Sequence, residues 1–239
     1  MLLKALGPTA LQELLDIFNA LFRNADCPQI WRNAIILPLL KAGKPASDLA
    51  SFRPISLTSC VVKILERLLA ERLYYLAEHL GWFNSTQAGF RKGRGCEDQI
   101  LKITQAIEDA FHQRPRKVSV LVLLDFSKAY DTVWRSKLLH SMLDTGVPPT
   151  YVKWIHAFLQ NCQERVRYDG TLGHSRQIHQ GLPQGSVLAP LLFLFYINNL
   201  ADILPGFNLN AMFADDVSIR HPTDQRKKQS ERLKRQWML

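Results

Sequence analysis

The sequence predicts an α+β fold in which packed helices are segregated from an antiparallel sheet. The chain has 239 residues, of which 47% are hydrophobic and 21% charged, so it has room for one large or two small domains with a sizeable core. Residues 118–124 form a continuous apolar, β-branched run, which is typical of a buried central strand. Two short strands at 209–214 and 217–220 flank Asp215 and Asp216 as a turn. We therefore expect an antiparallel sheet rather than a doubly wound one.

The N-terminal half predicts three helices and a strand. Thr9 followed by Gln12 is a capping-box pattern that opens the first helix. Residues 33–40 indicate a strand that leads into a turn-rich stretch at 41–51. A second helix ends at Gly81, and residues 99–111 indicate a third. The apolar faces of the first two helices consist of Leu11, Leu14, Leu15, Phe18, Leu21 and Phe22, and of Val61, Ile64, Leu65, Leu68, Leu69 and Leu76.

The C-terminal half adds three helices and a hairpin. Residues 132–143 and 151–159 indicate two helices, and residues 187–200 indicate a helix that is buried on most sides. Strands at 163–168 and 176–180 flank a glycine-containing turn. The sequence contains no internal repeat and no low-complexity linker, so we expect these elements to pack as one unit.

The chain is strongly basic, with 30 Lys and Arg residues against 21 Asp and Glu residues and a net charge of +9. This surplus favours a polyanionic partner such as nucleic acid or an acidic membrane. The longest apolar run, 187–197, is interrupted by Pro190 and is too short to cross a bilayer. The N-terminus carries no secretory pattern, so we expect an intracellular protein of the nucleus or cytoplasm without a membrane partner. The 4 cysteines lie far apart, which predicts reduced thiols rather than a zinc site or disulfides.

Three carboxylates stand at the ends of apolar strands, where a ligand can reach them. Asp125 closes the run 118–124, and Asp215 and Asp216 follow the segment 211–214. Neighbouring carboxylates repel each other unless a cation offsets their charge, and Mg²⁺ prefers such oxygen ligands. The alternative is that Asp125 caps a strand end and the pair Asp215–Asp216 forms an ordinary hairpin turn, since Asp is common in turns.

Five ordered blocks of sequence resemble the reverse transcriptases, specifically those of non-LTR (LINE-like) retrotransposons. They include Asp-Phe-Ser-Lys-Ala-Tyr-Asp from Asp125 and Phe-Ala-Asp-Asp-Val from Phe213. Between these two lies Gln-Gly-Leu-Pro-Gln-Gly-Ser-Val-Leu-Ala-Pro from Gln180. Upstream blocks at 51–57 and 87–94, with Lys41 before the first, agree with the same family.

The resemblance implies a right-hand polymerase that joins nucleotides with two Mg²⁺ ions, with Mn²⁺ as an alternative. It implies that Asp125, Asp215 and Asp216 are the catalytic metal ligands, with the carbonyl of Phe126 as an extra ligand. Paired metals of this kind activate the primer 3′-hydroxyl and hold the triphosphate. No protein nucleophile is then needed.

The resemblance also assigns four residues to the incoming deoxynucleoside triphosphate. Lys41 and Arg53 match residues that clamp the triphosphate, and Gln184 matches a nucleotide-contacting glutamine. Tyr130 matches the aromatic residue that stands under the sugar and excludes a 2′-hydroxyl. The alternatives are ordinary surface charge for Lys41 and Arg53, and a simple core aromatic for Tyr130.

A further set of residues is expected to contact the RNA template or DNA primer. Arg91, Lys92 and Arg94 suit phosphate neutralisation, although a solvated basic loop accounts for them equally well. Gly181 and Gly185 are expected to let the backbone approach the nucleotide or template closely. The basic tail at 220–235 either tracks nucleic acid or forms a solvated helix.

These expectations describe a single reverse transcriptase core at 1–239. Residues 1–117 form mainly the fingers, 118–220 mainly the palm and 221–239 a basic truncated tail, with the thumb absent or vestigial. The implied function is RNA-directed DNA polymerisation. One alternative is a truncated, catalytically inactive remnant that binds nucleic acid, and another is an RNA-templated RNA polymerase, against which Tyr130 argues.

Overall fold

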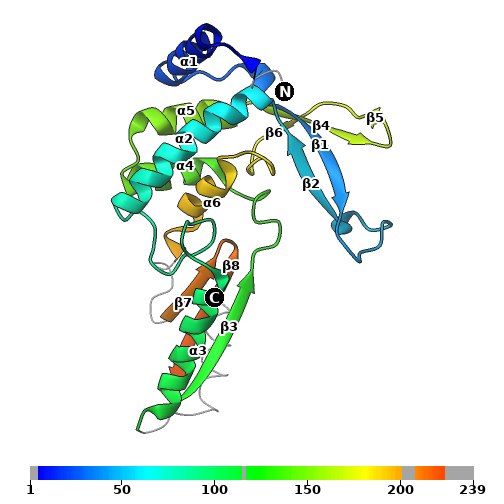
Figure 1. Cartoon of the computed structure of the whole chain (residues 1–239). Coiled ribbons are helices and arrows are strands. Elements are labelled where there is room, and N and C mark those ends of the chain that lie inside the picture. Colours follow the sequence, from blue (N-terminus) through cyan, green and yellow to red (C-terminus); the bar gives the residue numbers. More distant parts are fainter. Residues whose placement is uncertain (1–4, 115–116, 201–207, 224–239) are drawn as a thin grey trace. The chain divides into compact units, whose positions relative to one another are not determined.

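The computed structural model describes residues 5–114, 117–200 and 208–223 (Figure 1). The chain divides into two compact units, each built from two separate stretches of sequence. The first unit comprises Met1–Trp82 and Tyr130–Tyr196, and the second comprises Phe83–Ala129 and Ile197–Leu239. The division into fingers, palm and tail stays a prediction, and the tail beyond residue 223 lies outside the described residues.

Five helices of the first unit surround or form its core: α1 (Pro8–Arg23), α2 (Cys60–His79), α4 (Arg135–Thr145), α5 (Pro149–Leu159) and α6 (Ala189–Ile197). Helix α6 is buried on nearly all sides, as its continuous apolar sequence predicts, with Leu191, Leu192 and Phe195 fully enclosed. The capping box at Thr9 is wrong. Helix α1 begins earlier, with Gly7 as N-cap and Pro8 in its first turn, because proline lacks the N–H that a helix start leaves unpaired.

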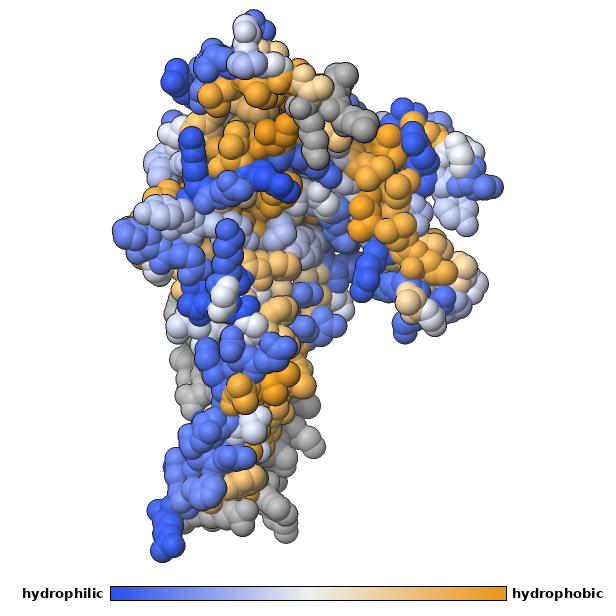
Figure 2. All heavy atoms as spheres, viewed as in Figure 1, coloured by the Kyte–Doolittle hydropathy of each residue, from blue (hydrophilic) through white to orange (hydrophobic). Residues whose placement is uncertain are grey.

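The first unit also carries a five-stranded sheet. Its strands are β1 (Asn33–Leu40), β2 (Phe52–Leu57), β4 (Cys162–Tyr168), β5 (Thr171–Leu172) and β6 (Arg176–Ile178), and its order is β2-β1-β4-β5 with β6 also paired to β4. The β1–β4 pair is parallel and the other pairs are antiparallel. Figure 2 shows apolar side chains along the β1–β2 hairpin, where Leu39 and Leu40 are about half exposed.

The second unit packs one helix on a three-stranded antiparallel sheet. Helix α3 (Cys96–His112) lies against β7 (Asn208–Phe213), and the strand order is β3-β8-β7 with β3 (Val118–Asp125) and β8 (Asp216–Thr223). Asp98 accepts a hydrogen bond from the backbone N–H of Gly95, the N-cap residue, so α3 begins at Cys96, three residues before the predicted start. The expectation that 118–124 is a buried central strand is wrong. Strand β3 lies at the sheet edge, and Leu123 is 72% exposed.

The α+β fold class is confirmed, and most predicted elements occur within a few residues of their expected bounds. Two local features differ. Strand β2 was not expected as a strand, and Asp216 is the first residue of β8 rather than a turn residue. Among the described residues, no helix has both the length and the apolar character needed to cross a membrane.

Candidate functional site

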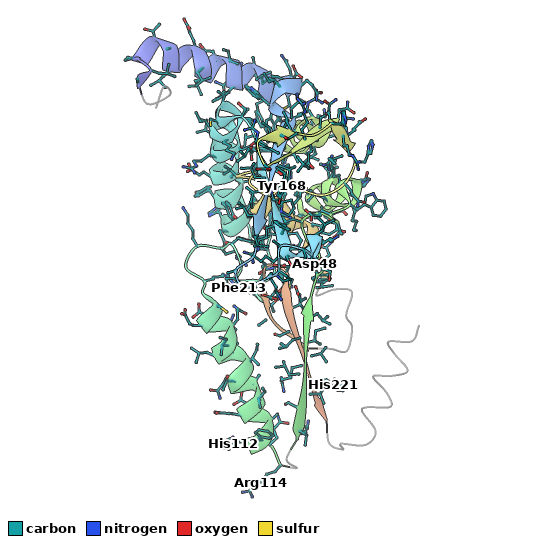
Figure 3. All side chains as sticks on the ribbon, turned by 90° about the vertical axis from the view of Figure 1, so that its right-hand side faces the viewer. Asp48, His112, Arg114, Tyr168, Phe213 and His221 are labelled. Carbon is teal, nitrogen blue, oxygen red and sulfur yellow. The ribbon has the colours of Figure 1, made fainter. Side chains whose placement is uncertain are left out.

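The hairpin β7–β8 presents Asp215 at its tip. Phe213, labelled in Figure 3, ends β7 and pairs with Asp216, so Ala214 and Asp215 are the two central residues of the turn. Ala214 has a φ of 56°, a left-handed value that L residues seldom adopt. On the other side of β8, Asp216 pairs directly with Asp125, the last residue of β3. Directly opposed residues project from the same face of a sheet, so the second unit brings these two carboxylates side by side.

These carboxylates are open to solvent. Asp125 and Asp216 are exposed and Asp215 is half exposed. Magnesium is commonly held by one or two carboxylates together with substrate phosphates, so the facing pair fits the donor set of such an ion. Within the described ranges, no group of three or more His, Cys, Asp or Glu side chains is gathered closely enough to hold a metal. The three-carboxylate site, and the carbonyl of Phe126 as its extra ligand, therefore stay predictions.

A buried glutamine next to this turn was not singled out from the sequence. Gln87 is 3% exposed, and its Oε1 accepts hydrogen bonds from the backbone N–H groups of Ala214 (2.9 Å) and Gly89 (2.8 Å). The sequence shows Gln87 only as the first residue of a family block, because a single polar residue in a loop has no periodicity that marks it as buried.

The basic segment beside Gln87 divides into buried and accessible residues. Arg91 is 7% exposed, donates hydrogen bonds to the carbonyls of Asn84 (2.9 Å) and Gln87 (3.2 Å), and stacks over the ring of Phe83. Its guanidinium therefore holds the loop together and is not displayed toward a phosphate. Lys92 is exposed, and Arg94 is partly exposed and donates to the carbonyl of Ser85.

Gly181 and Gly185 allow close approach to the protein's own backbone, which accounts for both glycines without a ligand. Both have positive φ values, and a Cβ at Gly181 would lie 2.7 Å from the carbonyl oxygen of Asp131. A Cβ at Gly185 would lie 2.6 Å from the carbonyl oxygen of Ser56. In the structure the close neighbours of these glycines are the segment of Asp131 and strand β2, and an approach to the nucleotide or template stays a prediction.

The loop 180–186 is held by two buried or half-buried charged side chains. Arg135, at the start of α4, donates hydrogen bonds to the carbonyls of four residues, namely Leu159, Ile178, Gln180 and Gly181. Glu66, fully buried in α2, accepts hydrogen bonds from the hydroxyl of Ser186 and from the N–H of Leu188. Burial raises the pKa of Glu66 above its ordinary value of 4.5.

The segments that carry the predicted nucleotide-binding residues meet in the first unit. The Gln184 carbonyl accepts a hydrogen bond from the N–H of Ser56 in β2, and its side-chain amide donates to Asp131 (2.7 Å). The N–H of Leu182 donates to the carbonyl of Tyr130 (2.8 Å). Strand β2, the loop 180–186 and the segment 130–131 are thus joined by hydrogen bonds.

The two residues predicted to bind the triphosphate lie on the β1–β2 hairpin. Arg53 pairs with Leu39, and Lys41 donates its backbone N–H to the carbonyl of Ser51, so strand alternation puts Lys41 and Arg53 on one face. The Lys41 ammonium donates to the carbonyl of Ala50 (3.0 Å), whereas the Arg53 side chain is exposed.

Tyr130 is half-buried, and its ring stacks on Phe193 of α6 with ring centroids 5.1 Å apart and planes 15° from parallel. This packing fits a core aromatic and also fixes the orientation of the ring. Its assignment to the sugar stays a prediction.

Comparison with known proteins agrees with these features. Residues 40–238 match the family described as "Reverse transcriptase (RNA-dependent DNA polymerase)". The chain is 33% identical over 222 residues to the "Probable RNA-directed DNA polymerase from transposon X-element" of Drosophila melanogaster. The aligned segment covers 92% of this chain and 24% of that relative. It is 30% identical over 223 residues to the "RNA-directed DNA polymerase from mobile element jockey" of the same fly, with 91% and 24% covered. The chain therefore spans about a quarter of the length of these relatives.

A solved structure shows the same fold. The apo telomerase from Candida tropicalis, truncated from the C-terminal domain, superposes with a TM-score of 0.57 at 12% identity and covers 95% of this chain and 51% of that chain. The sequence-based resemblance to reverse transcriptases of non-LTR retrotransposons is confirmed by the family match and by the transposon relatives. Because the match extends over residues 40–238, the chain belongs to the reverse transcriptase (RNA-dependent DNA polymerase) family.

Proposed function

We propose that this chain is the core of an RNA-directed DNA polymerase that adds deoxynucleotides to the 3′-hydroxyl of a DNA primer on an RNA template. The observation that carries this proposal is the facing pair Asp125 and Asp216, with Asp215 at the adjoining turn. An exposed pair of facing carboxylates suits divalent cations, and the family makes polymerisation the relevant chemistry.

Two bound Mg²⁺ ions would lower the pKa of the primer hydroxyl and stabilise the charge of the pyrophosphate leaving group. The role of Asp125, Asp215 and Asp216 is to supply anionic oxygen ligands for these ions. Their exposure supports this role because the primer and the triphosphate must reach the same carboxylates.

The remaining roles are those that the family resemblance implies, and the chemistry of each side chain is compatible with them. Lys41 and Arg53 are cations on one face of a hairpin, which suits the triphosphate. Gln184 is held by Asp131, and the ring of Tyr130 is fixed against Phe193, so both are ordered before a nucleotide binds. Lys92, Arg94 and the net charge of +9 favour the phosphates of the template and primer.

Primer extension tests this function. The chain is incubated with an RNA template, an annealed DNA primer, deoxynucleotides and Mg²⁺, and wild type is compared with Asp215→Asn. We expect Asp215→Asn to lower the incorporation rate by about 100-fold or more, since an amide is a weaker ligand for a hard cation. The matched control is Asp144→Asn, which removes an exposed carboxylate from α4 and should leave the rate unchanged.

Equal extension by wild type and Asp215→Asn would contradict the proposed mechanism. Salt-sensitive RNA binding without incorporation, in Mg²⁺ and in Mn²⁺, would instead identify a nucleic-acid-binding remnant.

A further inference from the structure

The turn that carries Asp215 is held from outside the hairpin by the segment 86–89. Gln87 uses both ends of its carboxamide on one residue of this turn. Its Oε1 accepts from the N–H of Ala214 (2.9 Å), and its Nε2 donates to the carbonyl of Ala214 (3.3 Å). Backbone donor and acceptor of a strained residue are therefore both bound by a single side chain that is 3% exposed.

The backbone of the same segment continues this pairing along β7. The N–H of Met212 donates to the carbonyl of Thr86 (3.0 Å), and the N–H of Ala88 donates to the carbonyl of Met212 (2.9 Å). This arrangement is a short parallel bridge between Gln87 and Met212. The side chain of Gln87 extends the bridge from β7 to the turn, where no strand continues.

Gly89 completes the support, since no side chain fits at its position. A Cβ at Gly89 would lie 2.1 Å from the backbone nitrogen of Ala214. Ala214 has a φ of 56°, and a non-glycine residue keeps such a conformation only where its surroundings enforce it. In this structure, Gln87 and Gly89 contact Ala214 and hold it in this conformation.

We propose that Gln87 is a positioning residue, which fixes the Ala214–Asp215 turn and thereby sets Asp215 and Asp216 against Asp125. The neutral amide suits this place because a charged side chain would perturb the three carboxylates beside it. The effect on nucleotide incorporation rests on the proposed function, whereas the effect on the turn does not.

The first experiment measures the turn itself without metal or substrate. Amide hydrogen exchange of Ala214, followed by NMR, is compared in wild type, Gln87→Met and Gln87→Glu. We expect Gln87→Met to accelerate exchange at Ala214 by about tenfold or more, because the N–H loses its only side-chain acceptor. Gln87→Glu keeps an acceptor oxygen for the N–H of Ala214 but replaces the Nε2 donor with an oxygen that faces the Ala214 carbonyl, so we expect exchange intermediate between wild type and Gln87→Met.

The matched control is Gln99→Met. Gln99 is also a buried glutamine of the second unit, 4% exposed on α3, and its Oε1 has no partner among the described residues. This variant should leave exchange at Ala214 unchanged. Unchanged exchange at Ala214 in Gln87→Met would overturn the proposal, and so would equal acceleration in Gln99→Met.

The second experiment measures single-nucleotide incorporation. We expect Gln87→Met to lower kcat by about 10- to 100-fold and to change KM for the deoxynucleotide by less than about threefold, since Gln87 is 3% exposed and its amide is bound to the backbone of Ala214. A normal kcat combined with accelerated Ala214 exchange would overturn the positioning role. If wild type incorporates nothing, the proposed function fails, and the exchange comparison alone then decides whether Gln87 fixes the turn.

Discussion

The Asp215 turn of the second unit and the loop 180–186 of the first are both held by buried polar side chains, but the chemistry of the two supports differs. The turn is bound by the neutral amide of Gln87. The loop is bound by a cation, Arg135, and by the carboxylate of Glu66. Both supports form hydrogen bonds with backbone groups.

This difference follows from what each segment displays. The turn presents carboxylates, so an additional charge beside it would shift their interaction with any cation. The loop presents the neutral Gln184 and several carbonyls, and the guanidinium of Arg135 binds two of these carbonyls, those of Gln180 and Gly181, together with the carbonyls of Leu159 and Ile178. The charged support brings a dependence on pH through Glu66 that the neutral support lacks.

The largest expected effect on stability comes from removing the guanidinium of Arg135. Arg135→Met leaves four carbonyls without their donor, and we expect it to lower the free energy of unfolding of the first unit by about 3 kcal/mol. Urea unfolding followed by the fluorescence of tryptophans such as Trp154 measures this. Arg165→Met is the matched control, because exposed Arg165 donates to the single carbonyl of Gly173 and should change stability by less than about 0.5 kcal/mol. Similar values for both variants would contradict the assigned role of Arg135.

An intermediate effect is expected where the loop touches the segment 130–133. Gly181→Ala places a methyl group against the carbonyl of Asp131 in a residue with a φ of 80°, and we expect a loss of about 2–3 kcal/mol. Gly43→Ala has a similar φ of 72° but open space around it, and should lose only about 1 kcal/mol. The same urea titration compares them. If the two losses are equal, the contact with Asp131 contributes nothing beyond backbone strain.

The smallest expected effect is a pH dependence of the free energy of unfolding, which Glu66 should cause and Gln87 should not. Because the folded pKa of Glu66 is raised, the stability that this group contributes is present below pH 4.5 and is lost as pH rises through the folded pKa. Wild type should therefore lose stability relative to Glu66→Gln as pH rises, by about 1 kcal/mol. Unfolding at several pH values measures this. The cost of Gln87→Met should be the same at each pH, and a matching pH trend in both variants would remove the distinction.

Local sequence patterns predicted the elements well but not their neighbours. The run 118–124 correctly indicates β3, yet its apolar character also suggested a central position. In the described part of the chain β3 pairs with β8 at the edge of the sheet, and its exposed residues Leu121, Leu123 and Asp125 alternate along the strand, so they share one exposed face. The pairing partner lies about a hundred residues away in sequence, so no local pattern specifies it.

For the glycines and the basic segment, too, the sequence did not specify the contact partners. The sequence predicted that Gly181 and Gly185 let the backbone approach the nucleotide or template, and this stays a prediction. The partner was decided by the fold, which brings Asp131 and Ser56 against them. Arg91 lies in a basic segment, but its guanidinium donates hydrogen bonds to carbonyls of its own loop.

The sequence by itself determined the family, the order of helices and strands, and which carboxylates stand at strand ends, since motifs and periodicity are properties of neighbouring residues. Only the tertiary structure decided that Asp125 faces Asp216 and that Gln87 binds both backbone groups of Ala214. Gln87 and Ala214 are 127 positions apart, and a hydrogen bond depends on distances of a few ångströms that arise only when strand register is established.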